Sequence, residues 1–197
     1  MSSTRLTADA RRQQILDVAI DVFGRSGYYG SSMNDIAEAA GVTKPVLYQH
    51  FDSKSELYAA LLDEVGNRLL TLIAKATASA ANGREQTELG FQAYFRWVAS
   101  RNHEFRLLFG GGARDDAEFS ATVRRITATA AAAIDPLIAV DLDPELRRTL
   151  AHGLVGLAEG ASRRLVERGE DFDPDATARA VSSLAWAGLR AIPPQQS

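Results

Sequence analysis

Residues 32–51 read SMNDIAEAAGVTKPVLYQHF, and this stretch decides the fold that we predict. Ser32 can cap a first short helix, because Asp35 follows three residues later, where a capping box requires it. Gly41 can end that helix in a left-handed conformation, and Thr43 can cap a second helix. A helix, a glycine turn and a helix are typical of a helix-turn-helix DNA reader, although an ordinary helical hairpin in a core has the same spacing.

Length and composition indicate a folded chain. With 197 residues, the chain can form one large domain or two small ones. Its hydrophobic content of 46% and charged content of 24% predict a soluble globular protein rather than a disordered one. There is no cysteine, which excludes disulfides and thiolate metal sites and fits a reducing cytoplasm. No apolar run could cross a bilayer, and the segment MSSTRLTADARRQQ has no signal-peptide core, so we expect a cytoplasmic protein without a membrane partner.

Bulk charge does not identify a nucleic-acid-binding protein. The net charge is −3 over the chain, and residues 1–60 carry six Lys or Arg against seven Asp or Glu. Binding to DNA would therefore depend on a few well-placed cations and on helix N-termini. If Arg5, Arg11 and Arg12 join those contacts, the affinity should fall steeply with salt.

Apolar residues recur at helical spacing along the chain, with no strand alternation of useful length and no internal repeat. The fold class that we predict is therefore all-α, with a short arm at residues 1–6. Besides the two short helices of residues 32–51, we expect helices over about 7–25, 55–80, 85–102, 103–109, 115–139, 144–168 and 174–190.

Proline and glycine mark the breaks between these helices. Asp143 and Asp173 each precede a proline, which is an acidic cap followed by the residue preferred in a first helical turn. Pro136 must kink or interrupt its helix, and the glycines at 110–112 must end theirs. Gly66 lies inside a helix at a cost of about 1 kcal/mol relative to alanine. We expect a close helix contact there, with a soft point as the alternative.

The last two helices carry features of a dimer interface. Gly153, Gly156 and Gly160 fall on one helical face, where small residues let another helix approach closely. In the final helix, Trp186 lies on a polar stripe opposite an apolar face, which indicates a second covered surface. We expect a homodimer, with packing inside one subunit as the alternative. The interface residues that we expect are Gly153, Gly156, Gly160, Val181, Ala185, Trp186 and Gly188.

The most specific motif of the chain is GVTKPVLYQHF followed by DSKSEL, within the longer run ILDVAIDVFGRSGYYGSSMNDIAEAAGVTKPVLYQHFDSKSELYAALL at residues 15–62. On these residues the chain resembles the DNA-binding domain of the tetracycline-repressor (TetR) family of bacterial transcription regulators. The resemblance implies an N-terminal DNA-binding domain at residues 1–54. It also implies a C-terminal helical domain at residues 55–197 that binds an effector and forms the dimer.

The function that the resemblance implies is sequence-specific regulation of transcription. We expect a repressor that binds a palindromic operator as a homodimer and leaves the DNA when a small effector binds. One alternative is a DNA-binding regulator that has no small-molecule effector. The other is a helical small-molecule-binding protein or enzyme whose reader-like segment is only structural.

Members of this family place the second reader helix in the major groove of double-stranded DNA, where its N-terminal side chains meet base edges. Lys44 could then donate to guanine or a phosphate, and the Gln49 amide suits adenine. Tyr48 and His50 can reach phosphate oxygens. Asn34 differs from the basic residue that many members have in the first reader helix. The DNA-binding residues that we expect are Ser32, Asn34, Thr43, Lys44, Pro45, Val46, Tyr48, Gln49, His50 and Lys54.

Aromatic residues concentrate in the middle of the chain. They indicate either a pocket for an apolar or aromatic effector with one polar group, or simply an aromatic core. The residues that we expect at such a pocket are Phe91, Tyr94, Phe95, Phe105, Phe109, Phe119, His152 and Arg163.

Catalytic and metal-binding patterns are scarce. The three histidines, His50, His103 and His152, lie far apart in the sequence, and none forms a pair at metal-ligand spacing. The glycines at 110–112 lack the lysine and the hydroxyl residue of a phosphate-binding loop. We therefore expect no enzyme activity, no cofactor and no metal.

Overall fold

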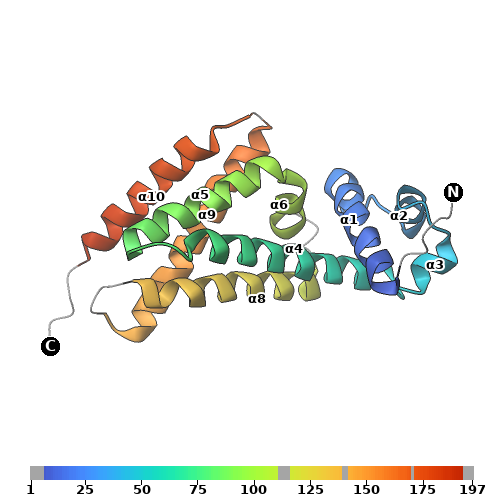
Figure 1. Ribbon diagram of the computed structural model, residues 1–197, viewed down its shortest axis with the longest axis horizontal. Helices are drawn as coiled ribbons and strands as arrows, with labels where there is room; N and C mark the ends of the chain where they lie inside the picture. Colours follow the sequence, from blue (N-terminus) through green and yellow to red (C-terminus); the bar gives the residue numbers. More distant parts are fainter. Residues whose placement is uncertain (1–6, 111–115, 139–141, 170, 193–197) are drawn as a thin grey trace. The chain divides into compact units, whose positions relative to one another are not determined.

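The computed structural model describes residues 7–110, 116–138, 142–169 and 171–192. The arm predicted at residues 1–6, with Arg5, and the glycines at 111 and 112 lie outside these ranges. The described residues form helices and short connections with no strand among them, which confirms the all-α prediction (Figure 1). The helices are α1 (Ala8–Ser26), α2 (Met33–Ala39), α3 (Lys44–Tyr48), α4 (Lys54–Thr77), α5 (Gly83–Ser100), α6 (Asn102–Phe109), α8 (Ala117–Ile134), α9 (Pro144–Arg168) and α10 (Pro174–Arg190).

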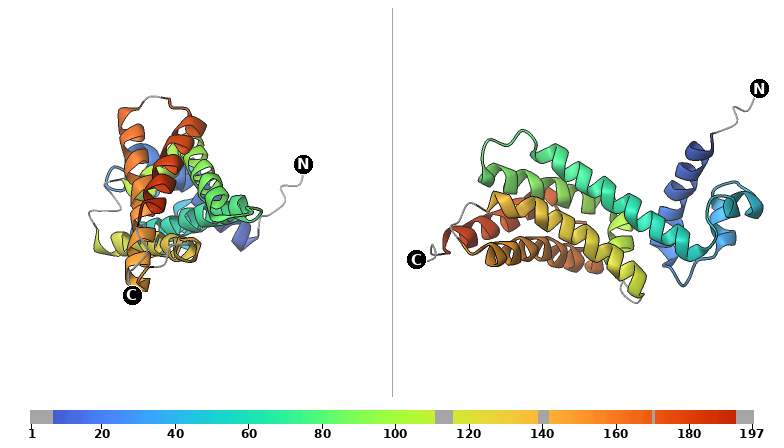
Figure 2. Two further views of the ribbon diagram at one scale, coloured as in Figure 1. Left: turned by 90° about the vertical axis from the view of Figure 1, so that its left-hand side faces the viewer. Right: turned by 90° about the horizontal axis from the view of Figure 1, so that it is seen from below.

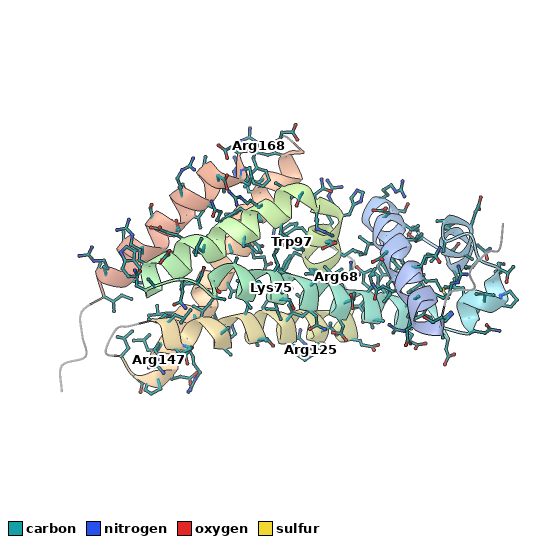
Figure 3. The ribbon with its side chains drawn as sticks, in the orientation of Figure 1. Arg68, Lys75, Trp97, Arg125, Arg147 and Arg168 are labelled. Atoms are coloured by element: carbon teal, nitrogen blue, oxygen red, sulfur yellow. The ribbon has the colours of Figure 1, made fainter. Side chains whose placement is uncertain are left out.

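Helix ends follow the local signals of the sequence. The carboxylate of Asp143 accepts hydrogen bonds from the first amides of α9, and that of Asp173 does the same for α10. The predicted interruption at Pro136 is confirmed, because α8 ends at Ile134 and a single 3₁₀ turn, η1 (Asp135–Leu137), follows. Arg147 on α9, labelled in Figure 3, donates to the Asp135 carboxylate at 2.7 Å and joins this turn to α9.

Contacts divide the chain into two compact units. The first contains residues Met1–Val65 and His103–Thr122, and the second contains Gly66–Asn102 and Val123–Ser197. The predicted domain boundary after residue 54 divides the chain by function, whereas these two units are defined by packing contacts. The predicted boundary therefore stays a prediction. No helix in the described ranges is long and apolar enough to cross a membrane.

The first unit is built around four aromatic rings. The ring centre of Tyr58 on α4 lies 5.0 Å from that of Phe23 on α1 and 4.7 Å from that of Phe119 on α8. Tyr28, in the turn after α1, lies 5.0 Å from Phe119. The Tyr58 hydroxyl donates to the carbonyl of Leu107 at 3.3 Å, and burial raises the pKa of Tyr58 to about 12. These contacts join four segments of the chain in one core.

Helix α6 approaches α1 closely within this unit. A Cβ atom added to Gly24 of α1 would lie 2.6 Å from the Cβ atom of His103 on α6, so only glycine fits there. The Nδ1 atom of His103 lies 3.3 Å from a carboxylate oxygen of Asp21, one turn earlier on α1. No local pattern indicates this contact, because the two helices are more than seventy residues apart in the sequence.

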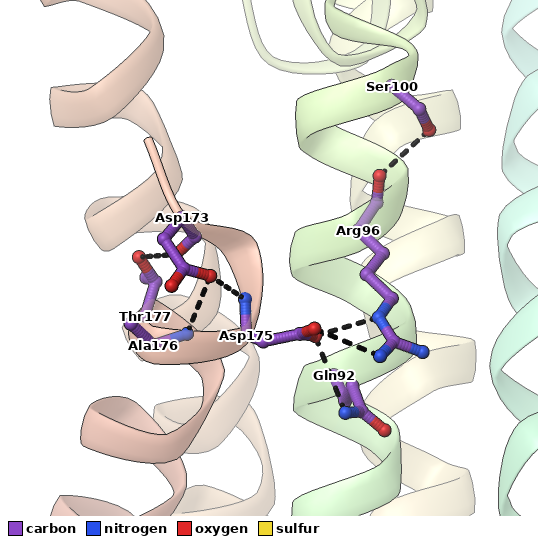
Figure 4. A network of polar contacts seen from close by, with 7 residues as sticks. All are labelled: Gln92, Arg96, Ser100, Asp173, Asp175, Ala176 and Thr177. Carbon is purple, nitrogen blue, oxygen red and sulfur yellow. Dashed lines mark hydrogen bonds and ion pairs between the residues drawn. The ribbon is translucent and has the colours of Figure 1, made fainter. Parts of the chain in front are cut away.

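The second unit places α5 and α10 side by side (Figures 1 and 2). Figure 4 shows the polar contact at one end of this pair, where Arg96 on α5 donates to both carboxylate oxygens of Asp175 on α10, at 2.7 and 3.0 Å. Gln92, one turn before Arg96, lies 3.4 Å from the same carboxylate. The hydrogen bonds from Arg96 lower the pKa of Asp175.

Gly66 contacts another helix of the second unit. A Cβ atom added to it would lie 2.4 Å from Cδ1 and 2.7 Å from Cγ1 of Ile126 on α8. The glycine therefore lets α4 and α8 approach each other closely, as the sequence predicts. The structure gives no reason to treat this position as a soft point.

Candidate nucleic-acid interface

The first reader helix begins with the predicted capping box. The Ser32 hydroxyl oxygen accepts a hydrogen bond from the Asp35 amide at 3.3 Å, and the Asp35 carboxylate accepts one from the Ser32 amide at 2.8 Å. The hydrogen bond from the Ser32 hydroxyl, followed by the one from its amide, lowers the pKa of Asp35. Both contacts fix the N-terminus of α2.

The turn between the two reader helices follows the sequence prediction at Gly41 and departs from it at Thr43. Gly41 has a φ of +64°, the left-handed conformation that glycine adopts without strain. Thr43 is at the N-cap position of α3, but its hydroxyl forms no capping hydrogen bond. The Thr43 carbonyl instead accepts the first hydrogen bond of the turn, from the Leu47 amide at 3.1 Å. The Thr43 side chain is exposed and uninvolved in the cap.

Burial orients α3. Leu47 is fully buried, and Phe51, just after the helix, is 1% exposed. Because α3 has one side fixed in the core, the residues around Leu47 face outward. Tyr48 is 45% exposed, which is unusual for a large ring. The other exposed residues of the predicted set are Ser32, Asn34, Thr43, Lys44, Pro45 and Gln49, while Val46 and His50 are half-buried.

Lys54 has a role that the sequence did not predict. Its ammonium nitrogen donates to the carbonyl oxygens of Tyr28 at 2.9 Å and Ser31 at 3.0 Å. It also lies 4.4 Å from the centre of the Tyr28 ring, within cation–π range. Two of its three donors are therefore used inside the protein. Lys54 therefore holds the turn before α2 against the start of α4, and its contact with DNA stays a prediction.

Arg12 is a cation beside the reader. Its guanidinium lies 4.8 Å from the centre of the Phe51 ring, at the end of the reader, and the residue is exposed. Arg11 is half-buried and donates to the Gln14 side chain at 2.8 Å. Gln14 in turn donates to the Ala40 carbonyl at 3.3 Å, at the end of α2. Of the two arginines, Arg12 is the better placed to meet a phosphate.

The residues expected at an effector pocket belong to both compact units. Phe105, Phe109 and Phe119 are buried in the first unit. In the second, Phe91, Tyr94 and Phe95 are buried on α5. Arg163 is half-buried and forms an ion pair with Glu159. His152 is exposed on α9, so it does not lie with the buried aromatic residues and we remove it from this set.

The residues expected at a dimer interface differ in how exposed they are in the single chain. Gly153, Gly156, Gly160 and Gly188 are exposed, and an added Cβ atom would meet nothing within 4 Å at any of them. Ala185 is buried, and Val181 and Trp186 are half-buried. Leu184 on α10 is 63% exposed. The buried side of α10 consists of Ala178, Ser182 and Ala185.

Comparisons with known proteins identify relatives of this chain. The family model described as "Bacterial regulatory proteins, tetR family" matches residues 15–61. Over 191 residues the chain is 32% identical to the HTH-type transcriptional activator FasR of Mycolicibacterium smegmatis, covering 96% of this chain and 87% of that protein. The HTH-type transcriptional regulator AcrR of Shigella flexneri is 43% identical over 58 residues, which are 29% of this chain and 27% of AcrR.

Two solved structures extend the likeness to the whole fold. A TetR-like transcriptional regulator from Rhodococcus sp. RHA1 superposes with a TM-score of 0.78 at 29% identity, covering 95% of this chain and all of that one. The transcriptional regulator FadR from Bacillus subtilis, solved in complex with stearoyl-CoA, has a TM-score of 0.78 at 20% identity over 89% of this chain and 98% of its own.

No group of three or more His, Asp or Glu side chains that could hold a metal occurs among the residues described.

Proposed function

Because the chain belongs to the TetR family of bacterial transcription regulators, we propose that it binds a palindromic operator as a homodimer and responds to a small molecule. Residues 1–54 read the DNA, and residues 55–197 bind the effector and form the dimer. The protein acts in the bacterial cytoplasm, where its DNA lies. We assign it as a repressor, although FasR is named an activator. In vitro transcription from the bound promoter, with and without the protein, shows whether the protein represses or activates transcription.

The observation that carries the DNA-binding assignment is the orientation of α3. Leu47 is buried and fixes the helix, while Lys44, Tyr48 and Gln49 are exposed. Lys and Gln side chains can read guanine and adenine edges in the major groove, and a tyrosine hydroxyl can donate to a phosphate. Arg12 adds a cation at the end of the reader. This small set of contacts fits a chain whose net charge is −3.

Exposure of small residues on α9 and α10 supports the homodimer. The glycines at 153, 156 and 160 leave one face of α9 open, and Gly188 and the exposed Leu184 lie on α10. A glycine face lets a second helix approach closely, and an exposed leucine then becomes buried. Dimerisation would also supply the two readers that a palindromic operator needs.

The effector class that we propose is a long-chain acyl-CoA. FadR from Bacillus subtilis was solved with stearoyl-CoA, and its fold is similar to that of this chain. Phe91 and Phe95 on α5 offer apolar surface of the kind that an acyl chain requires. A regulator without a small-molecule effector remains the second candidate, and unchanged operator affinity under acyl-CoA titration would favour it.

Operator binding is tested by selecting bound DNA fragments with the purified full chain and measuring their affinity by fluorescence anisotropy. Lys44→Ala and Tyr48→Ala should each weaken binding by at least about tenfold, because each removes a contact to a base edge or phosphate. Arg84→Ala is the matched control, since Arg84 is an exposed cation of the second unit paired with Glu88. Unchanged affinity in both reader variants would exclude α3 as the reader.

A further inference from the structure

Two buried hydroxyl groups of the second unit stand out. Tyr94 on α5 is 7% exposed and Ser162 on α9 is fully buried. Neither the Tyr94 Oη atom nor the Ser162 Oγ atom has a hydrogen-bond partner among the residues described. Tyr58, the buried tyrosine of the first unit, differs in this respect, because its hydroxyl donates to the Leu107 carbonyl.

An unpaired buried hydroxyl destabilises a protein, and native structures pair nearly all such groups. Here two of them are close enough to influence each other, because the Ser162 hydroxyl opposes the rise in the pKa of Tyr94. The two oxygen atoms are nevertheless not in hydrogen-bonding geometry. Two neighbouring hydroxyls that lack partners form a ready site for a polar atom of a ligand.

The surroundings of this site are mostly apolar. The Tyr94 ring centre lies 5.5 Å from that of Phe95 and 6.0 Å from that of Trp97, and both neighbours are buried on α5. Figure 3 labels Trp97 on this helix. The nearby charged groups are Glu159 and Arg163, which pair with each other on the same helix as Ser162 and are each about a quarter exposed. A ligand bound here would meet aromatic surface and one small polar patch.

The protonation state of Tyr94 indicates which kind of ligand atom it can bind. Burial raises the pKa of Tyr94, so the tyrosine keeps its proton near neutral pH and can donate it in a hydrogen bond. The charge of Glu159 is offset by its ion pair with Arg163, so the two hydroxyls decide what binds here. A carbonyl oxygen, which accepts hydrogen bonds, fits this site.

We propose that the Tyr94 and Ser162 hydroxyls bind the thioester carbonyl oxygen of the effector, so that the site favours an acyl thioester over a thioether of the same chain length. This inference rests on the proposed acyl-CoA effector and names the part of the ligand that the protein recognises. It adds Ser162 to the site, which the sequence did not suggest because a serine inside a helix carries no signal of its own.

The test uses the full chain and two probes that share one alkyl chain length. Stearoyl-CoA carries the thioester carbonyl, and octadecyl-CoA is the thioether that lacks it. Calorimetric titration should give stearoyl-CoA at least about fivefold higher affinity than octadecyl-CoA, the value of one net hydrogen bond.

The variants separate recognition from folding. Tyr94→Phe and Ser162→Ala should each reduce the preference for stearoyl-CoA over octadecyl-CoA, and Tyr94→Phe should melt no lower than the unchanged protein, because its hydroxyl has no partner to lose. Tyr58→Phe is the matched control, and it should melt lower while keeping the preference. If stearoyl-CoA does not bind at all, the proposed effector class fails together with the inference. If it binds without preference over the thioether, the inference alone is overturned.

Discussion

The ammonium nitrogen of Lys54 lies 2.9 Å from the carbonyl oxygen of Tyr28 and 4.4 Å from the centre of the Tyr28 ring. A second hydrogen bond runs to the Ser31 carbonyl, so one side chain at the start of α4 fixes the turn that precedes α2. Tyr28 also contacts Tyr58 and Phe119 through its ring. The lysine thus couples the position of the reader to the aromatic core of its own unit.

Replacing Lys54 should therefore lower the stability of the fold rather than remove a direct contact with DNA. Lys54→Ala leaves two carbonyl groups without their donor and should lower the free energy of unfolding by about 1–3 kcal/mol. Urea denaturation followed by circular dichroism measures this loss. Lys44→Ala, which replaces an exposed lysine of α3, should denature like the unchanged protein and lose only DNA affinity. Equal stability of the two variants would show that the contacts of Lys54 with Tyr28 and Ser31 do not stabilise the fold.

The capping box of α2 predicts a stability effect that depends on pH. Ser32→Ala removes the cap and should cost about 1 kcal/mol near neutral pH. The folded state lowers the pKa of Asp35 below its ordinary value of 3.8, so this carboxylate stabilises the fold at higher pH. That contribution is lost as the pH falls from the ordinary value through the lowered one. The stability difference between the unchanged protein and Ser32→Ala should therefore shrink below about pH 4. A difference that stays constant down to about pH 2 would contradict the role of Asp35.

The contact of Gly66 with Ile126 predicts opposite effects for two glycine substitutions. Gly66→Ala gains about 1 kcal/mol of helix propensity but forces a methyl group against Ile126, which typically costs about 1–3 kcal/mol. We expect a net loss of stability. Gly90→Ala is the matched control, because its new methyl group would lie 3.6 Å from Thr77, at an ordinary contact distance, and it should stabilise α5.

A double substitution isolates this packing contact. Ile126→Ala makes room beside Gly66, so Gly66→Ala should cost less in that background than in the unchanged protein. The expected coupling is about 0.5–3 kcal/mol, the range for residues in direct contact. Thermal denaturation of the four proteins gives the coupling directly. Additive effects would mean that α4 and α8 move apart instead of repacking.

The exposed Leu184 predicts where the dimer forms. Leu184→Glu places a charge on the open face of α10 and should convert the protein to a monomer at micromolar concentration, with unchanged helix content. Light scattering coupled to size exclusion measures the mass. Leu72→Glu is the control, since Leu72 is also exposed, at 41%, but lies on α4. A monomeric unchanged protein would exclude the homodimer, and a Leu184→Glu dimer would place its interface elsewhere.

Local signals in the sequence were sufficient to predict the helix boundaries and the two reader helices. Ser32 with Asp35, Gly41 in the left-handed region, and the aspartates before two helices all act within a few residues of themselves. Such interactions depend on the sequence nearby, so they can be predicted without knowing the rest of the fold. The cap at Thr43 is the exception, because the hydroxyl does not form the bond that its position allows.

Exposure within a helix was not determined by the sequence. His152 lies on a helix that was placed correctly, but it is exposed and does not join the buried aromatic residues with which the sequence grouped it. The helical period only groups residues by face. Which face is covered depends on the neighbouring helices, and on α10 the buried side consists of the small residues Ala178, Ser182 and Ala185, while Leu184 is exposed.

The sequence by itself determined the all-α class, the helix-turn-helix and the family, because these depend on short-range caps, turns and a specific motif. Only the tertiary structure decided that Lys54 binds the carbonyls of Tyr28 and Ser31 and that Tyr94 and Ser162 lie near each other without partners. These relationships join residues that are far apart in the chain. They exist because packing brings separate helices together, which no local pattern records.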